Sequence, residues 1–175
     1  MVLSLGNTLR VEVPFTDDAE CVGPRIGITG EDESGIADDL GPLEAPALGT
    51  ALDLEDIVIC DVGAHKMWMA RMFRCEQPNT CIISNGFASM GIAVPGAIAA
   101  KLVHPERNIV AVTGDAGFLM NSQEIETAMR CRLPIVILIW SDSSYGLIEW
   151  KQMNEFGRAS HKRFSNLDRV ARLVS

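Results

Sequence analysis

The sequence predicts an α/β domain in three layers, with helices on both faces of a parallel sheet. Four short apolar runs, rich in β-branched residues, lack the polar alternation of half-exposed strands, which is typical of strands buried on both faces. Each run ends at Gly, Asn, Asp or Ser residues. The segment between the last two runs is long enough for the helical crossover that parallel strands need. We therefore predict strands at Ile57–Cys60, Cys81–Ser84, Ile109–Thr113 and Ile135–Trp140.

Residues 1–50 differ in character from the rest of the chain. They contain ten acidic and two basic residues, whereas residues 51–175 contain thirteen of each. The stretch is rich in Gly and Pro and shows no sustained period, so we expect a loosely ordered extension before one domain at residues 51–175. Because no basic face stands out, nucleic acid is not an expected partner.

The first predicted strand leads into a turn and an amphipathic helix. The turn reads Asp61-Val62-Gly63-Ala64-His65. The main chain at a helix N-terminus offers N–H donors to an anion, and a histidine ring can add another. The alternative reading of His65 is a surface histidine near a helix start.

The second predicted strand leads into a turn and helix built from small residues. The turn spans Asn85–Met90, and Ala, Ile, Val and Gly dominate the helix after it. Small side chains let the backbone approach a ligand or a neighbouring chain closely. The alternative is a buried small-residue helix in which Met90 only fills space.

The last two predicted strands place two carboxylates at one edge of the sheet. Gly114-Asp115-Ala116-Gly117 follows the third strand, and Ser141-Asp142 follows the fourth. Open α/β sheets bind ligands just beyond the carboxyl ends of their strands. A Mg²⁺ ion that bridges phosphates fits two such oxygen ligands, because it usually takes one or two carboxylates from the protein. The alternative is that Gly114-Asp115 forms only a turn.

These motifs resemble the thiamin-diphosphate signature of the acetolactate synthase and pyruvate decarboxylase superfamily. The resemblance implies that Asp115, Asp142 and the main-chain carbonyl of Ser144 hold Mg²⁺. Most members have Asn-Asn where this chain has Ser141-Asp142. The additional carboxylate adds a negative charge beside an anionic diphosphate, so nearby cations or N–H dipoles have to compensate for it.

The resemblance also implies which residues bind the cofactor. The turn at Gly63 lies against the diphosphate, and Met90 supports the bent cofactor while adjacent main-chain groups bind its pyrimidine. Leu147 and Ile148 lie near the thiazolium. The full set of implied cofactor-binding residues is Gly63, Ala64, His65, Ala88, Ser89, Met90, Gly114, Asp115, Ala116, Gly117, Tyr145, Gly146, Leu147 and Ile148.

One position bears on the type of acetolactate synthase. Biosynthetic members carry a Trp five residues beyond the glycine that corresponds to Gly146, where it favours 2-ketobutyrate. Here Lys151 occupies that position and Trp150 comes one residue earlier. The departure points to the catabolic type, with pyruvate as the 2-keto acid substrate.

The resemblance covers only the diphosphate-binding domain. In the family a glutamate from a pyrimidine-binding domain, usually on a partner subunit, activates the cofactor, so no catalytic residue is expected in this chain. Glu124 and Glu126 are not candidates for that role. We expect a homo-oligomer or a pyrimidine-domain subunit as partner. Two alternatives stay open: a non-catalytic module that binds thiamin diphosphate and Mg²⁺, and one half of a split 2-keto acid decarboxylase or oxidoreductase.

A last family pattern lies near the end of the sequence. The pattern Phe164-x-Asn166-x-Asp168 precedes one more strand and helix in the family, so we expect a sheet that is incomplete at the C-terminus.

No apolar run has membrane-spanning length and the N-terminus lacks an export leader, so we expect a cytoplasmic protein with no membrane partner. The five cysteines form no C-x-x-C pair, which argues against a disulfide framework or a zinc site.

Overall fold

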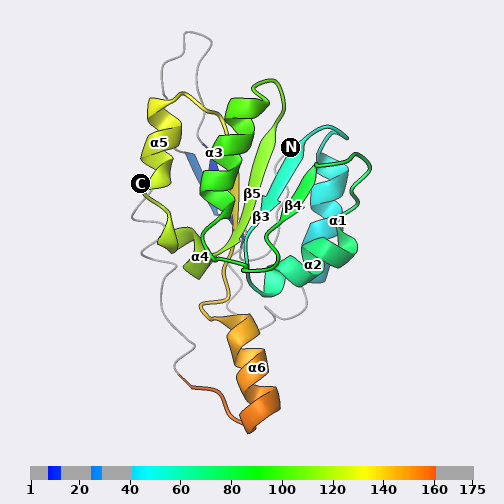
Figure 1. Cartoon of the computed structure of the whole chain (residues 1–175), viewed down its shortest axis with the longest axis vertical. Coiled ribbons are helices and arrows are strands. Elements are labelled where there is room, and N and C mark those ends of the chain that lie inside the picture. Colours follow the sequence, from blue (N-terminus) through cyan, green and yellow to red (C-terminus); the bar gives the residue numbers. More distant parts are fainter. Residues whose placement is uncertain (1–7, 13–24, 29–40, 161–175) are drawn as a thin grey trace.

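A single mixed sheet forms the centre of the protein. The computed structural model describes residues 8–12, 25–28 and 41–160. Within them the strands lie in the order β2-β1-β6-β5-β3-β4 (Figure 1). Their bounds are Thr8–Glu12 (β1), Arg25–Ile28 (β2), Ile57–Cys60 (β3), Cys81–Ile83 (β4), Ile109–Gly114 (β5) and Val136–Trp140 (β6).

The four predicted strands are confirmed, and they pair in parallel. β3 lies between β4 and β5, with Val58 opposite Cys81 and opposite Val110. β5 in turn pairs with β6. β4 ends one residue earlier than predicted, β5 extends one residue further, and β6 begins one residue later. The predicted α/β fold class is therefore confirmed.

The N-terminal part contributes elements that the sequence pattern does not predict. β1 pairs antiparallel with both β2 and β6, with Leu9 opposite Ile139. Helix α1 spans Gly41–Ala51. The outer edge of β6 would otherwise present unpaired N–H and C=O groups, and β1 pairs with them. The division of the chain at residue 50 stays a prediction, and the expected C-terminal incompleteness concerns residues 161–175, outside the described ranges.

Helices cover both faces of the parallel strands. Alternate residues of a strand point to opposite faces, so Ile59 joins the cluster around Phe118 while Val58 joins the cluster around Met69. Helices α3, α4 and α5 lie on the first face, where α3 runs beside β5 in Figure 1, and α1 and α2 lie on the second. Their bounds are Ala64–Met72 (α2), Ala93–Val103 (α3), Asp115–Met120 (α4) and Glu124–Arg130 (α5).

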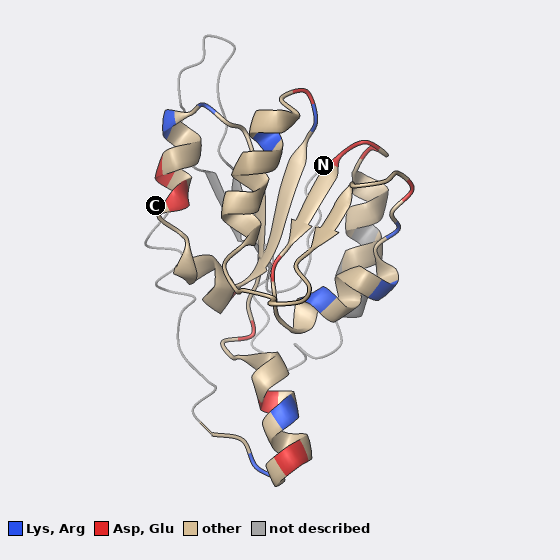
Figure 2. Ribbon diagram, viewed as in Figure 1, with Lys and Arg blue, Asp and Glu red and all other residues tan. Residues whose placement is uncertain are grey.

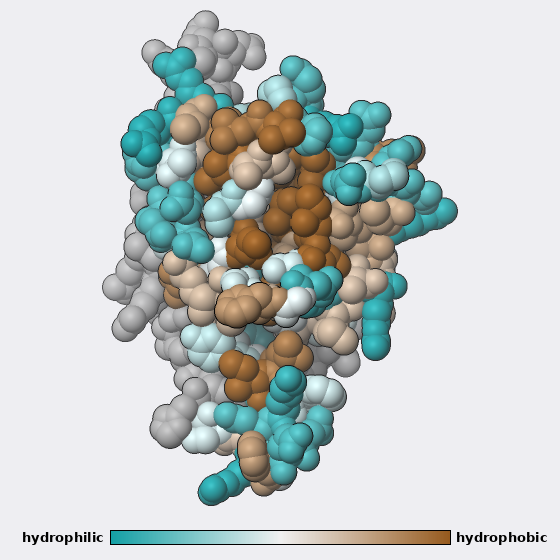
Figure 3. All heavy atoms as spheres, viewed as in Figure 1, coloured by the Kyte–Doolittle hydropathy of each residue, from teal (hydrophilic) through white to brown (hydrophobic). Residues whose placement is uncertain are grey.

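The four parallel strands carry no charged residue, although Asp56, Asp61, Lys101 and Asp115 beside them are buried. In Figure 2 the coloured charged residues lie on helices and loops around the parallel strands. The outer side of α3 stays apolar, with Leu102 and Val103 exposed, and Figure 3 shows apolar side chains gathered over α3 and the neighbouring part of the sheet. In the part of the chain that the structure describes, no helix has the length and apolar character needed to cross a membrane.

Helix α6, Gly146–Phe156, stands apart from these layers. It begins just beyond the carboxyl end of β6 and extends away from the sheet (Figure 1). No residue of α6 is buried, and Trp150 and Phe156 are exposed.

Two phenylalanines at opposite extremes of burial test this packing. Phe118 is fully buried, whereas Phe87 is 97% exposed. Phe118→Ala should lower the free energy of unfolding by about 3–5 kcal/mol, because it leaves a cavity in the core. Phe87→Ala should change it by no more than about 0.5 kcal/mol. Urea unfolding of both variants measures the difference, and equal losses of stability would contradict this core.

Candidate functional site

The carboxyl ends of four parallel strands bring the predicted motifs to one edge of the sheet. The turn at Gly63 follows β3, the Met90 turn follows β4, Asp115 follows β5 and Asp142 follows β6. These segments meet at the end of the sheet from which α6 extends (Figure 1). The shared edge follows from the parallel pairing, since all four strands run in the same direction.

Asp115 joins the loops that follow β5 and β6. Its carboxylate is buried, and Oδ1 accepts a hydrogen bond from the N–H of Ala116 at 2.8 Å. Oδ2 accepts two more, from the hydroxyl of Ser141 and from the N–H of Ser143, both at 3.0 Å. The loop after β6 is therefore held to the first residue of α4.

Asp142 is exposed at the same edge and is held by the main chain. Its Oδ1 accepts the N–H of Ser144 at 2.9 Å. Ser143 between them has φ 54°, in the left-handed region, which costs a non-glycine residue free energy and is common at binding sites. A Cβ on Gly146 would lie 3.0 Å from Asp142 Oδ2 and 3.7 Å from the Cβ of Ala64. The loop after β6 thus packs against the start of α2.

The electrostatics of this pair favour a bound cation. Burial raises the pKa of Asp115 most, hydrogen bonds from Ala116, Ser141 and Ser143 lower it, and the charge of Asp142 raises it. Two neighbouring carboxylates gain from a positive charge between them. Among the described residues no group of three or more His, Cys, Asp or Glu side chains gathers. A metal at this edge would therefore take two carboxylates and complete its shell with other oxygens, as Mg²⁺ does.

The first turn of α2 opens toward the same edge. Gly63 is its N-cap, and no side chain caps the N–H groups of the first turn. Such groups bind anions at helix N-termini. Lys66 Nζ donates to the carbonyl of Ser84 at 3.0 Å, which holds the start of α2 to the end of β4.

The side chain of His65 lies inside the protein. It is buried, and its ring meets that of Trp140 edge-on with centroids 6.0 Å apart. Burial lowers the pKa of His65 to about 4, against the opposing influence of Asp61, so the ring is neutral at pH 7. Its Nε2 atom is buried without a partner. The alternative of a surface histidine is therefore wrong, while a contact between the ring and a ligand stays a prediction.

The Met90 turn is fixed by two residues that the sequence analysis does not single out. The N–H of Gly91 donates to the carboxylate of Asp61 at 2.9 and 3.0 Å, and Asn121 Nδ2 donates to the carbonyl of Gly91 at 2.7 Å. Ala88 in this turn has φ 52°. A polar residue directly after a predicted buried strand is the one signal that could have indicated Asp61.

Comparison with known proteins decides the family. Residues 61–173 match the family described as thiamine pyrophosphate enzyme, C-terminal TPP binding domain. The chain belongs to this family. Thiamine pyrophosphate is the compound called thiamin diphosphate above, so the resemblance read from the sequence is confirmed.

Curated relatives include several acetolactate synthases. The chain is 43% identical to an acetolactate synthase of Bacillus subtilis over 135 residues. The aligned region covers 77% of this chain and 24% of that protein. It is 38% identical to a catabolic acetolactate synthase of Raoultella terrigena over 121 residues. Here the aligned region covers 66% of this chain and 22% of that protein. The chain therefore spans about a quarter of the length of these relatives.

The residues at the edge fit thiamine pyrophosphate and a divalent cation. The uncapped first turn of α2 suits a diphosphate, and the carboxylates of Asp115 and Asp142 suit a hard metal ion. The N–H groups of Ser143 and Ser144 on those carboxylates supply the dipoles expected to offset the charge of Asp142.

The remaining predicted cofactor residues divide between this edge and the interior. Ser89 is exposed in the Met90 turn. The N-cap and first turn of α6 are partly or largely exposed, and they contain Tyr145, Gly146, Leu147 and Ile148. Gly114 is the N-cap of α4, whereas Ala116 and Gly117 are buried. The roles of all these residues toward the cofactor stay predictions.

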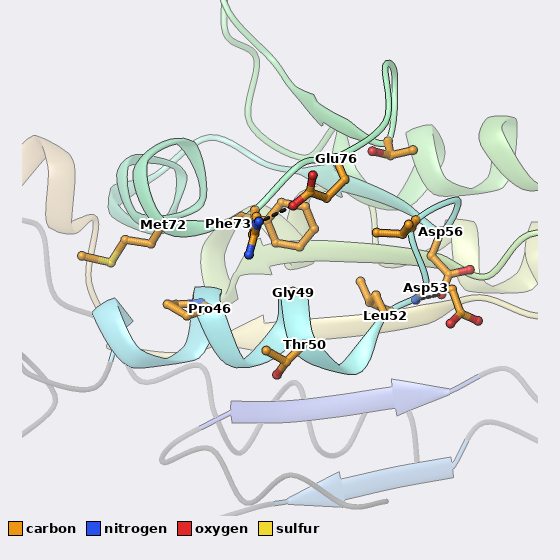
Figure 4. Close-up of a pocket in the computed structure, with 12 residues that line it drawn as sticks. Pro46, Gly49, Thr50, Leu52, Asp53, Asp56, Met72, Phe73 and Glu76 are labelled. Atoms are coloured by element: carbon orange, nitrogen blue, oxygen red, sulfur yellow. Dashed lines mark hydrogen bonds and ion pairs between the residues drawn. The ribbon is translucent and has the colours of Figure 1, made fainter.

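A separate pocket lies at the opposite edge of the sheet. It has a volume of about 370 Å³ and lies at the amino ends of β3 and β4, beside α1 (Figure 4). Several of its polar groups pair with one another: the N–H of Asp53 donates to Asp56 Oδ2 at 3.0 Å, and Arg74 pairs with Glu76. This pocket contains none of the motif residues.

The buried His65 makes stability depend on pH. Its pKa is about 4 in the folded protein, below the ordinary 6.5, so the unfolded chain binds more protons between these values. The contribution of His65 to the free energy of unfolding is therefore complete above about pH 6.5. It is lost as the pH falls toward 4, and the total loss is about 3 kcal/mol. Urea unfolding at several pH values should show this loss in the native protein and a smaller one in His65→Gln. The same pH dependence in both proteins would contradict a buried, neutral His65.

Proposed function

We propose that this chain binds thiamin diphosphate with Mg²⁺ and serves as the diphosphate-binding part of an acetolactate synthase-like enzyme. The observation that carries the proposal is the junction of the loops after β5 and β6, where Asp115 accepts hydrogen bonds from Ser141 and Ser143 and lies beside Asp142. The acetolactate synthases among the relatives support the reaction class.

Each part of the edge has a role in this proposal. Asp115, Asp142 and the carbonyl of Ser144 hold Mg²⁺, and the N–H groups at Ala64 and His65 bind the diphosphate. Gly146 leaves room beside Asp142, because a Cβ there would lie 3.0 Å from its Oδ2. When bound, thiamin diphosphate supplies the nucleophilic carbon and the electron sink for decarboxylating a 2-keto acid.

Apolar residues serve the organic part of the cofactor. Met90, half-buried in the turn after β4, packs against the cofactor, and Leu147 and Ile148 at the start of α6 line the reacting end. Pyruvate is the proposed substrate and the catabolic type the proposed subtype. Support for the subtype is that Lys151, rather than Trp150, occupies the fifth position after Gly146.

The acid that activates the pyrimidine is proposed to come from a partner. Glu124 already accepts a hydrogen bond from Thr127 at 2.9 Å, and Glu126 pairs with Arg130 at 3.5 Å, both on α5. Neither therefore takes this role. A pyrimidine-binding domain on a partner subunit would supply the glutamate and cover the exposed start of α6.

Cofactor binding should depend on both the metal and Asp115. Calorimetric titration with thiamin diphosphate should show binding in Mg²⁺ and at least tenfold weaker binding in EDTA, because the metal links the diphosphate to two carboxylates. In Mg²⁺, Asp115→Ala should bind thiamin diphosphate as weakly as the native chain does in EDTA. Asp53→Ala, which removes an acidic side chain at the opposite edge, should bind as the native chain does. Equal affinity in EDTA, or in Asp115→Ala, would refute the proposal.

The chain alone should not produce acetolactate from pyruvate. Loss of a positioned proton-transfer group typically slows a reaction by about 10²–10⁴-fold. A colorimetric acetoin assay should therefore detect no product from the purified chain and should detect product once a pyrimidine-domain protein is added. Turnover by the chain alone, in a preparation free of host synthase, would show that the proposed division of roles is wrong.

A further inference from the structure

The carboxylate of Asp61 connects three segments of the candidate site. It is 1% exposed at the end of β3. It accepts hydrogen bonds from the N–H of Val62 at 2.7 Å, from the N–H of Gly91 at 2.9 Å and from the hydroxyl of Thr113 at 3.0 Å. Burying a carboxylate is costly unless such donors satisfy it, so these three segments and Asp61 hold one another in place.

Gly91 is held from both sides. Asp61 accepts its N–H, and Asn121 Nδ2 donates to its carbonyl at 2.7 Å. The residue has φ 84°, and a Cβ would lie 2.7 Å from Asn121 Nδ2 and 3.0 Å from the Cβ of Met120. No other residue fits there without strain. The peptide groups on both sides of Gly91 are therefore each held by a side chain, and the Met90–Gly91 peptide ties the main chain of Met90 to Asp61.

The same carboxylate also contacts the loop that carries Asp115. Thr113 donates to Asp61 Oδ2, and a Cβ on Gly117 would lie 2.9 Å from that atom. These two residues flank Asp115 at equal distance along the chain. Asp61 therefore lies between the Met90 turn and the metal-binding loop and touches both.

We propose that Asp61 and Asn121 are positioning residues that set Met90 at a fixed distance from Asp115. The inference rests on the proposed function, in which Met90 contacts the organic part of thiamin diphosphate and Asp115 holds the metal on its diphosphate. One ligand then has to meet both residues at once. A turn already held in place binds it more tightly, since no ordering is left to occur on binding.

Asp61→Asn tests the proposal against a matched control. The amide keeps one acceptor oxygen in place of two, so the N–H of Gly91, which donates to both Oδ1 and Oδ2 of Asp61, loses one of its two acceptors. The control is Asp56→Asn, at the opposite end of β3, where a buried carboxylate accepts hydrogen bonds from Asn108 at 3.1 and 3.2 Å. Both changes replace a buried carboxylate by an amide, and only the first concerns the Met90 turn.

Two readouts separate positioning from a general loss of stability. In Mg²⁺, Asp61→Asn should bind thiamin diphosphate at least tenfold more weakly than the native chain, and Asp56→Asn should bind it within about twofold. In the free proteins, amide hydrogen exchange at Gly91 should be at least tenfold faster in Asp61→Asn and unchanged in Asp56→Asn. Similar effects of both variants on affinity, or no effect of Asp61→Asn on exchange, would overturn the proposal.

Asn121→Asp provides a second variant that spares the metal-binding loop. It replaces the donor to Gly91 by a carboxylate oxygen. Asn121→Asp should lower the affinity for thiamin diphosphate about tenfold. It should leave the affinity for inorganic pyrophosphate with Mg²⁺ unchanged, because pyrophosphate does not reach Met90. Unchanged affinity for thiamin diphosphate would overturn the proposal even if Asp61→Asn fails to fold. If the native chain binds neither ligand, the proposed function fails, while the exchange rate at Gly91 still decides whether Asp61 holds the turn.

Discussion

The parallel pairing of β5 with β6 is the constraint on which the site depends. Gly114 lies opposite Trp140 in the register, so the next residues, Asp115 and Ser141, leave the sheet side by side. Their 3.0 Å hydrogen bond follows from that register. A shift of β6 by one residue would turn all of its side chains to the opposite face and separate the two loops. The core packing that fixes the register therefore also fixes the distance between the two metal-binding candidates.

Burial gives the site its rigidity and limits what its groups can do. Asp61 and Asp115 are carboxylates in the interior, and each is surrounded by N–H and O–H donors from neighbouring loops. Such networks are strong when every member is satisfied and costly when one is missing. Burial also lowers the pKa of His65 to about 4, which keeps its ring neutral at pH 7. The loops are thus held by hydrogen bonds inside the protein, while the side chain of Asp142 is exposed.

The parts of the structure that could be predicted are those set by local pattern. Runs such as Ile109–Gly114 are buried on both faces, so their composition identifies them, and the order of strands and polar turns places Asp115 and Asp142 at one edge. The pairing of β1 with β6 depends on an unpaired edge elsewhere in the fold, which no local pattern in residues 1–50 records. The bonds that Gly91 makes with Asp61 and Asn121 each span thirty residues, so spacing along the chain does not reveal them.

Paramagnetic broadening tests most directly whether the edge formed by β5 and β6 holds a metal on a diphosphate. Mn²⁺ takes the oxygen ligands that suit Mg²⁺. With Mn²⁺ and the chain present, the ³¹P resonances of thiamin diphosphate should broaden well beyond the effect of free Mn²⁺, and excess Mg²⁺ should reverse this additional broadening. The double variant Asp115→Asn, Asp142→Asn should show none of the additional broadening. The same broadening in that variant, or none in the native chain, would contradict the assignment of the metal to these two carboxylates.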